Sequence, residues 1–171
     1  MKRQTGLVIL LVMLAGFLPG IVSAETSPLE QARSQFAGRH YDKAISLIKK
    51  EIKKSGENAD LLVLMADSYR ALGEERKAEK VYRQALDLEP GHVAGRLNFG
   101  MLLVATRERR EAIALIKTVL AENPSHARAH YCLGMAYNAR ADINDAFEQY
   151  NILKKLDKEL AAALYNAIFS K

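Results

Sequence analysis

Alanine recurs along this chain at a fixed interval, and that interval constrains the fold more than any other feature. The recurring residues, each 34 positions apart, are Ala44, Ala78, Ala112 and Ala146. Pro90 and Pro124 follow predicted helical segments at the same interval. Proline disfavours helix for the residue before it, so the two prolines mark segment ends. A period of this length is typical of a two-helix repeat, so the chain is predicted to be an all-α solenoid of antiparallel helix pairs.

Other residue types recur in the same register. Upstream of the alanines come small residues, Ala66, Gly100 and Gly134, each followed three positions later by a large one, Tyr69, Leu103 and Tyr137. Four positions after the last three alanines come Tyr82, Ile116 and Tyr150. Small residues let two helices approach closely, and large residues fill the space around the crossing. The two helices of each repeat are therefore predicted to cross at a pair of small residues.

These positions resemble the tetratricopeptide repeat, TPR, with its pattern W-x2-L-G-x2-Y, then A-x3-F, then P. The predicted repeats are a degenerate first copy at 25–58, then 59–92, 93–126 and 127–158. Leu62, Arg96 and His130 stand at the Trp position, and Lys158 stands where the last Pro is expected. The resemblance implies a right-handed TPR solenoid.

The C-terminal residues 159–171 are predicted to form a capping helix. Leu160, Leu164 and Ile168 share a stripe over residues 158–169. Tyr165 and Phe169 lie outside that stripe. They are interpreted either as ordinary cap packing or as a face for a partner or a second copy of the chain, which would make a homo-oligomer.

Residues 1–24 have the features of a bacterial export signal. Lys2 and Arg3 precede an apolar stretch, and Val22-Ser23-Ala24 offers small residues before a cut at Glu25. The protein is therefore predicted to be periplasmic. The alternative is an uncleaved signal that anchors the protein in the inner membrane, and membrane association is expected only in that case.

The charge of the chain gives no nucleic-acid footprint. Removing Lys2 and Arg3 with the signal lowers the formal net charge from +5 to +3. A cluster of lysines ends one predicted helix at Lys49, Lys50, Lys53 and Lys54. Lysines in a last turn complement the helix dipole and stay solvated. The alternative is a contact with anionic lipid or with an acidic protein.

No residue pattern points to catalysis, a cofactor, a metal or a small-molecule substrate. Cys132 is the only cysteine and is interpreted as a semi-buried apolar filler, with an intermolecular disulfide as the alternative. His126 and His130 have a metal-binding spacing, but no Asp, Glu or Cys completes the set. Phosphate loops, nucleophile elbows and paired cysteines are absent from the sequence. An enzyme or metal carrier remains the third hypothesis.

The resemblance implies that a partner's peptide or helix binds the concave face, which the first helices line. Family pattern places the contacts at Val63, Asp67, Arg70, Leu97, Asn98, Met101, Val104, Arg128, Tyr131, Met135 and Asn138. Leu97, Met101 and Tyr131 are predicted to form an apolar floor. Asn98 and Arg128 match two positions of the clamp by which some TPR proteins hold a chaperone's C-terminal carboxylate, but the other positions differ. The expected function is a non-enzymatic protein–protein adaptor in the cell envelope, and the alternative is a dedicated assembly factor for an envelope system such as pilus, secretion, outer-membrane or cytochrome c biogenesis.

Overall fold

The computed structural model describes residues 27–170, and the predicted signal at 1–24 lies outside the described residues. Within this range the chain is helical, without strands. The helices are α1 Pro28–Ala37, α2 Tyr41–Ser55, α3 Ala59–Ala71, α4 Glu75–Leu88, α5 Val93–Ala105, α6 Arg109–Glu122, α7 Ala127–Arg140, α8 Ile143–Leu156 and α9 Lys158–Phe169. Of these described helices, none is long and apolar enough to cross a bilayer.

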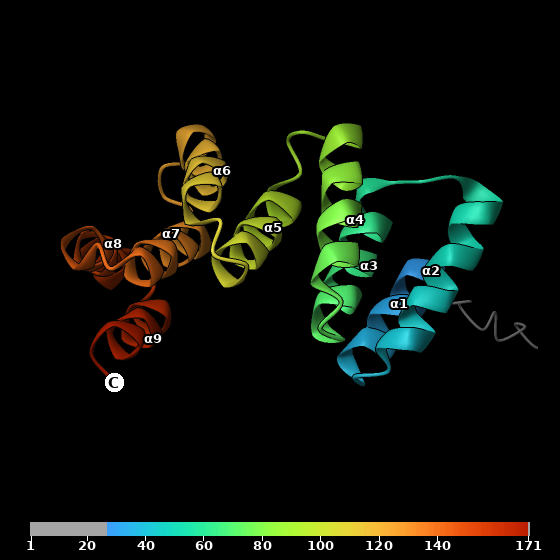
Figure 1. Ribbon diagram of the computed structural model, residues 1–171, viewed down its shortest axis with the longest axis horizontal. Coiled ribbons are helices and arrows are strands. Elements are labelled where there is room, and N and C mark those ends of the chain that lie inside the picture. The colour runs from blue at the N-terminus through green and yellow to red at the C-terminus, as the bar shows by residue number, and fades with distance from the viewer. Residues whose placement is uncertain (1–26, 171) are drawn as a thin grey trace, which may run out of the picture.

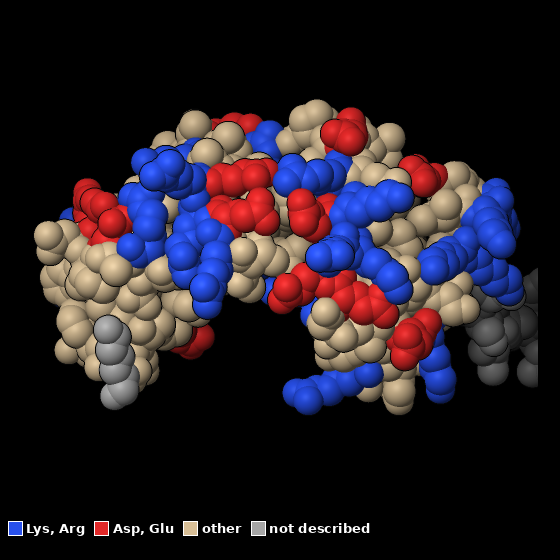
Figure 2. All heavy atoms as spheres, in the orientation of Figure 1, with Lys and Arg blue, Asp and Glu red and all other residues tan. Residues whose placement is uncertain are grey.

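The helices form a curved array of antiparallel pairs (Figure 1). Each odd-numbered helix packs against the even-numbered helix that follows it, and α9 packs against both α7 and α8. The odd-numbered helices also pack on one another in sequence, from α1 to α9. The even-numbered helices of the described range do not pack in this way, and α4 and α6 are linked by the ion pair between Arg83 and Glu111. An array that is close-packed along one row and open along the other must curve toward the packed row. The odd-numbered helices therefore line the inner side of the arch, where Figure 2 shows a hollow.

The recurring small residues lie where helices cross. Ala78, Ala112 and Ala146 are fully buried. A Cβ added to Gly100 on α5 would lie 2.8 Å from Cγ1 of Ile116 on α6. A Cβ added to Gly134 would collide with Leu164, so this glycine admits α9 to the face of α7. The small positions therefore set the distance between neighbouring helices.

The turn inside each helix pair contains one residue in the left-handed conformation. The residues, again 34 apart, are Arg39, Gly73, Arg107 and Ala141, with φ of 59°, 76°, 72° and 68°. Glycine adopts this conformation without a steric penalty, and other residues do so at a cost. Only one of the four left-handed positions holds a glycine, so the repeat packing imposes this backbone on Arg39, Arg107 and Ala141.

The proline stops lie just beyond the helices that they end. The helix α4 ends two residues before Pro90, and α6 ends two residues before Pro124. Polar residues at the Trp position reach these loops: Nε of Arg96 donates to the carbonyl of Pro90, and Nε2 of His130 lies 2.9 Å from the carbonyl oxygen of Pro124. Here a side chain from the following helix holds the loop by a hydrogen bond, which explains how Arg and His are accommodated where the pattern has Trp.

Candidate partner-binding surface

The inner side of the arch is lined by α3, α5 and α7 (Figure 1), the helices that carry the residues predicted for partner contact. Two are exposed, namely Arg70 and Arg128. Six are half-buried, namely Asp67, Met101, Val104, Tyr131, Met135 and Asn138. Three are buried, namely Val63, Leu97 and Asn98. The predicted set is therefore brought to one side of the molecule but only partly reaches solvent.

Two of the predicted contact residues need correction. Val63 is 5% exposed and Leu97 is 1% exposed. Val63 faces the next first helix, since a Cβ added to Gly95 would lie 3.1 Å from its Cγ2. Leu97 belongs to the core that joins α5, α6 and α7. Both side chains are covered by the neighbouring repeat, so they support the surface from beneath and cannot touch a partner.

A chain of polar side chains crosses the inner surface from one repeat to the next. Nδ2 of Asn98 on α5 donates to both carboxylate oxygens of Asp67 on α3, at 3.0 and 2.9 Å. The hydroxyl of Tyr82 on α4 donates to the same carboxylate. Nη2 of Arg128 on α7 donates to Oδ1 of Asn98. This Asp67–Asn98–Arg128 ladder joins three successive repeats.

The ladder also explains why the surface is not an open carboxylate clamp. The amide nitrogen of Asn98, which such a clamp would offer to a ligand, is already engaged by Asp67. Asp67 itself occupies another clamp position with the wrong charge for binding a carboxylate. The two matching residues therefore serve the contact between repeats.

Burial governs the electrostatics of the ladder. It raises the pKa of the Asp67 carboxyl above its usual value, against the opposing effects of the Tyr82 hydrogen bond and the nearby charge of Arg70. It also raises the pKa of Tyr82, and the adjacent Asp67 adds to that shift. The exposed groups beside this pair are the guanidinium groups of Arg70 and Arg128. The inner surface thus offers a partner positive charge next to half-buried Met101, Tyr131 and Met135.

The helix α9 closes one end of this surface. Nδ2 of Asn138 donates to the carbonyl of Ala167 on α9 at 2.9 Å. The family pattern predicts a partner contact for Asn138, but this hydrogen bond commits its amide to α9. The part of the surface that remains open therefore lies on α3, α5 and the part of α7 that precedes Asn138.

Cys132 is more deeply buried than the sequence indicates, at 3% exposed. Burial raises the pKa of its thiol to about 11. Only the thiolate reacts, so this side chain is not placed to form an intermolecular disulfide in the folded protein. Cys132 fills space between α7 and its neighbours.

The two histidines with metal-binding spacing have other roles. Nδ1 of His126 accepts a hydrogen bond from the backbone N–H of Ala129 at 3.2 Å and so caps α7. His130 is buried, with Nδ1 2.8 Å from Oε1 of Gln149 and Nε2 beside the carbonyl of Pro124. Within residues 27–170, no group of three or more His, Cys, Asp and Glu side chains could hold a metal ion.

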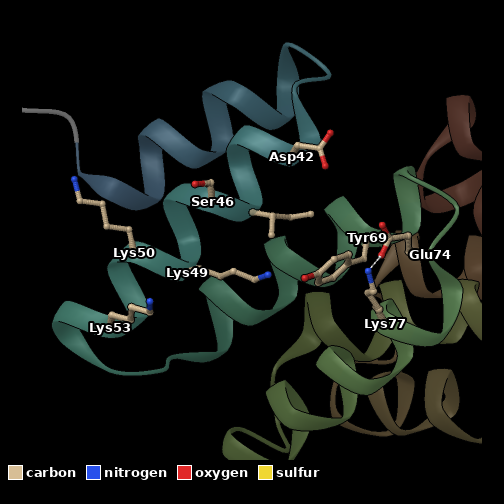
Figure 3. Close-up of a pocket in the computed structure, with 9 residues that line it drawn as sticks. Asp42, Ser46, Lys49, Lys50, Lys53, Tyr69, Glu74 and Lys77 are labelled. Atoms are coloured by element: carbon tan, nitrogen blue, oxygen red, sulfur yellow. Dashed lines mark ion pairs between the residues drawn. The ribbon is translucent and has the colours of Figure 1, made fainter.

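A basic cleft of about 590 Å³ lies away from the inner surface, between α2 and the α3–α4 pair (Figure 3). Nζ of Lys49 and Nζ of Lys77 lie 5.8 and 5.5 Å from the centre of the Tyr69 ring. Lys77 also pairs with Glu74. Lys50 and Lys53 extend the positive rim. The sequence places the α2 lysines together, but only the fold places Lys77 opposite them.

Comparisons with known proteins agree with the architecture. Family models described as tetratricopeptide repeat match residues 29–95 and 69–135. The chain is 28% identical to the peptidyl-prolyl cis-trans isomerase PASTICCINO1 of Arabidopsis thaliana, over 85% of this chain. It spans only 28% of that relative's length.

Solved structures with the same fold include two that are described as TPR proteins, and MamA. A thermophilic TPR protein of Thermus thermophilus has a TM-score of 0.73 at 20% identity, covering 84% of this chain and 80% of that chain. YrrB, described as a TPR protein with an unusual peptide-binding site, has a TM-score of 0.68 at 23% identity, covering 79% and 71%. MamA of Desulfovibrio magneticus has a TM-score of 0.65 at 21% identity, covering 84% and 94%.

The family-model matches together run from residue 29 to residue 135, which is more than half of the chain. They cover the 34-residue register and the helix pairs from α1 to α6. The chain belongs to the tetratricopeptide repeat family.

Proposed function

We propose that this protein is a non-enzymatic adaptor that binds a peptide or helix of a partner protein on the inner surface of its arch. TPR arrays bind other proteins, and this chain shares that general role. Apolar and cationic groups lie side by side on one concave surface, and this observation supports peptide or helix binding there. Met101, Tyr131 and Met135 are half-buried there, and Arg70 and Arg128 stand beside them.

The chemistry of this surface fits a segment that is apolar on one side and acidic on the other. Methionine adapts its shape to a bound side chain, and tyrosine supplies apolar area with a polar tip. The two guanidinium groups can pair with a partner's carboxylates. The resemblance to YrrB, which is described as having a peptide-binding site, supports the same kind of ligand.

The isomerase activity in the name of PASTICCINO1 is not carried over to this chain. The match covers 28% of that protein and 85% of this chain, whose described residues form the helical array. A repeat array in a longer enzyme can recruit partners without contributing to the chemistry.

The proposed compartment is the cell envelope, because the sequence of residues 1–24 has the features of an export signal. A dedicated assembly factor for one envelope system stays the alternative within the same proposal. Fractionation of the native host cells tests the compartment. We expect the protein in the periplasmic fraction with an intact mass that begins at Glu25, whereas membrane-bound protein that retains residues 1–24 would favour the anchored form.

A comparison of two variants in affinity capture from an envelope extract tests the binding surface. Met101→Glu adds a charge on the inner surface, and Gln84→Glu adds the same charge on the exposed side of α4. We expect proteins captured by the wild type to be retained by Gln84→Glu and lost by Met101→Glu. Equal capture by all three, with circular dichroism showing folded protein, would place the binding surface elsewhere.

A further inference from the structure

The C-terminal helix has one buried face that matches the first helices of the complete repeats. On α9 the buried residues are Ala161, Leu164 and Ile168. Their spacing of three and then four residues is also found on α7, in the buried residues Ala129, Cys132 and Ala136. Both sets belong to the core that joins these helices to the preceding ones. The buried face of α9 therefore resembles that of a first helix of another repeat.

The second face of α9 is uncovered. On α7 the residues that immediately follow the matching set are His130, Leu133 and Tyr137, and all three are buried. Nδ1 of His130 lies 2.8 Å from Oε1 of Gln149 on α8, the helix that packs on α7. On α9 the corresponding residues are Ala162, Tyr165 and Phe169, and all three are exposed. Tyr165 is 44% exposed and Phe169 is 52% exposed. The described chain has no helix after α9 to cover them.

A contact inside the array supports this equivalence. The Tyr82 ring on α4 stacks on Phe99 of the next first helix, with ring centres 5.6 Å apart. Tyr150 holds the repeat position of Tyr82 on α8 and meets Tyr165 at 5.4 Å. Phe99 is only 3% exposed because α6 then covers it. Tyr165 makes the same inner contact and lacks the cover.

The uncovered residues form a continuous surface with an adjoining hollow. Phe169 lies 4.7 Å from Tyr165 and 6.1 Å from Phe147, measured between ring centres. A cavity of about 270 Å³ lies beside Tyr165 and Tyr150. The charged residues that line it are Lys154 and Lys158, and Lys154 also lies over the Tyr150 ring at 5.6 Å.

We propose that this face docks an amphipathic helix of a partner protein, in the place that the second helix takes in each complete repeat. The apolar side of the docked helix would cover Tyr165 and Phe169. Its flank would carry acidic residues, because the hollow is lined by two lysines and by no acid. A second copy fits less well, since a two-fold interface brings the same patch of both subunits together and would place these lysines on both sides.

The test uses a helical peptide derived from α4, the helix that covers α3. The probe has the sequence of residues 75–88 with Arg76, Lys77, Lys80 and Arg83 each replaced by glutamate, a helix-stabilising staple on its exposed side, and a fluorescein label. It keeps the apolar side formed by Ala78, Val81, Tyr82 and Ala85, which α4 buries in the protein. The same stapled peptide with its native basic residues is the charge control. Fluorescence polarisation measures binding to the full chain.

We expect saturable binding of the acidic peptide that weakens at least about tenfold in Tyr165→Ser/Phe169→Ser, because aromatic anchors dominate such interfaces. Lys154→Glu/Lys158→Glu should reverse the preference toward the basic peptide. Both pairs are exposed or half-exposed, so circular dichroism should report folded protein. Met101→Glu on the inner surface should leave binding of the probe unchanged, which separates this site from the proposed concave one.

Three results would overturn the proposal. The first is the absence of saturable binding to the wild type. The second is unchanged affinity in the folded Tyr165→Ser/Phe169→Ser variant, or an unchanged peptide preference after the lysine reversal. The third is a wild-type dimer in light scattering that these substitutions dissociate, because a second copy would then be the occupant of the face.

Discussion

At the scale of single residues, Asp67 joins two repeats on the inner surface. Its carboxylate accepts hydrogen bonds from Tyr82 in its own repeat and from Asn98 in the next. The same burial that makes these bonds strong also disfavours the charged form of the carboxyl. The sequence predicts that Asp67 and Asn98 share a surface, but it does not predict that they bind each other, because the family pattern assigns both to an external ligand.

The pH dependence of stability tests the state of Asp67. Because its folded-state pKa is raised, the unfolded chain loses this proton first as pH rises. The contribution of Asp67 to the free energy of unfolding is then full below its ordinary pKa of 3.8 and is lost as pH rises through the raised value. We expect the difference in unfolding free energy between wild type and Asp67→Asn to fall with rising pH, measured by urea denaturation. A difference that grows with pH would mean that the hydrogen bonds outweigh burial.

The sequence does not predict which side chains of the inner surface are buried. Family spacing assigns Val63 and Leu97 to the surface that a partner would contact, but both side chains are buried. Whether such a side chain meets solvent or a neighbour depends on the small residues opposite, such as Gly95, which lets α5 approach α3 closely. That pairing between repeats has no signal within one repeat.

The crossing of α5 and α6 is the element-scale feature that the sequence predicts best. Ala112 on α6 is fully buried, and its carbonyl oxygen would lie 3.7 Å from a Cβ on Gly100. We expect Ala112→Leu to lower the free energy of unfolding by about 1–3 kcal/mol through overpacking. Ala121→Leu makes the same change at an exposed position of α6 and should leave stability nearly unchanged. An equal melting temperature for Ala112→Leu and wild type would contradict this packing.

The sequence does not predict the left-handed conformation in the turn between α7 and α8. Ala141 holds a φ of 68°, the conformation that Gly73 adopts in the equivalent turn. Ala141→Gly should relieve a left-handed strain on the order of 1 kcal/mol, reduced by the greater flexibility of glycine in the unfolded chain. We expect a net gain in unfolding free energy in thermal or urea denaturation. A loss would show that the turn holds alanine without strain.

Helix boundaries follow closely from local signals, while turns do not. The stripe over residues 158–169 predicts α9, which runs from Lys158 to Phe169. Its start is fixed by Asp157, whose carboxylate accepts hydrogen bonds from the N–H groups of Glu159 and Leu160. Such caps are readable in a sequence. A left-handed arginine or alanine carries no comparable signal, because the array packing imposes it.

At the scale of the whole molecule, the row of first helices and the curvature of the arch create the hollow that a partner can occupy. The 34-residue register is sufficient to predict this architecture, because each repeat can bury its apolar side only against its neighbours. The open apolar face of α9 does not follow from that register. The face is open because the described residues contain no second helix after α9 to cover it.

Isothermal titration calorimetry of the purified chain with a partner segment identified by envelope capture tests whether the inner surface is the binding site. Met101→Glu places a charge where a partner's side chain must be buried, and an unpaired buried charge is costly. Gln84→Glu is the matched control. We expect wild-type affinity for Gln84→Glu and a loss of at least about tenfold for Met101→Glu, with the same helical content by circular dichroism. Undiminished binding by a folded Met101→Glu protein would contradict the concave site, and unfolding of that variant would show that Met101 belongs to the core.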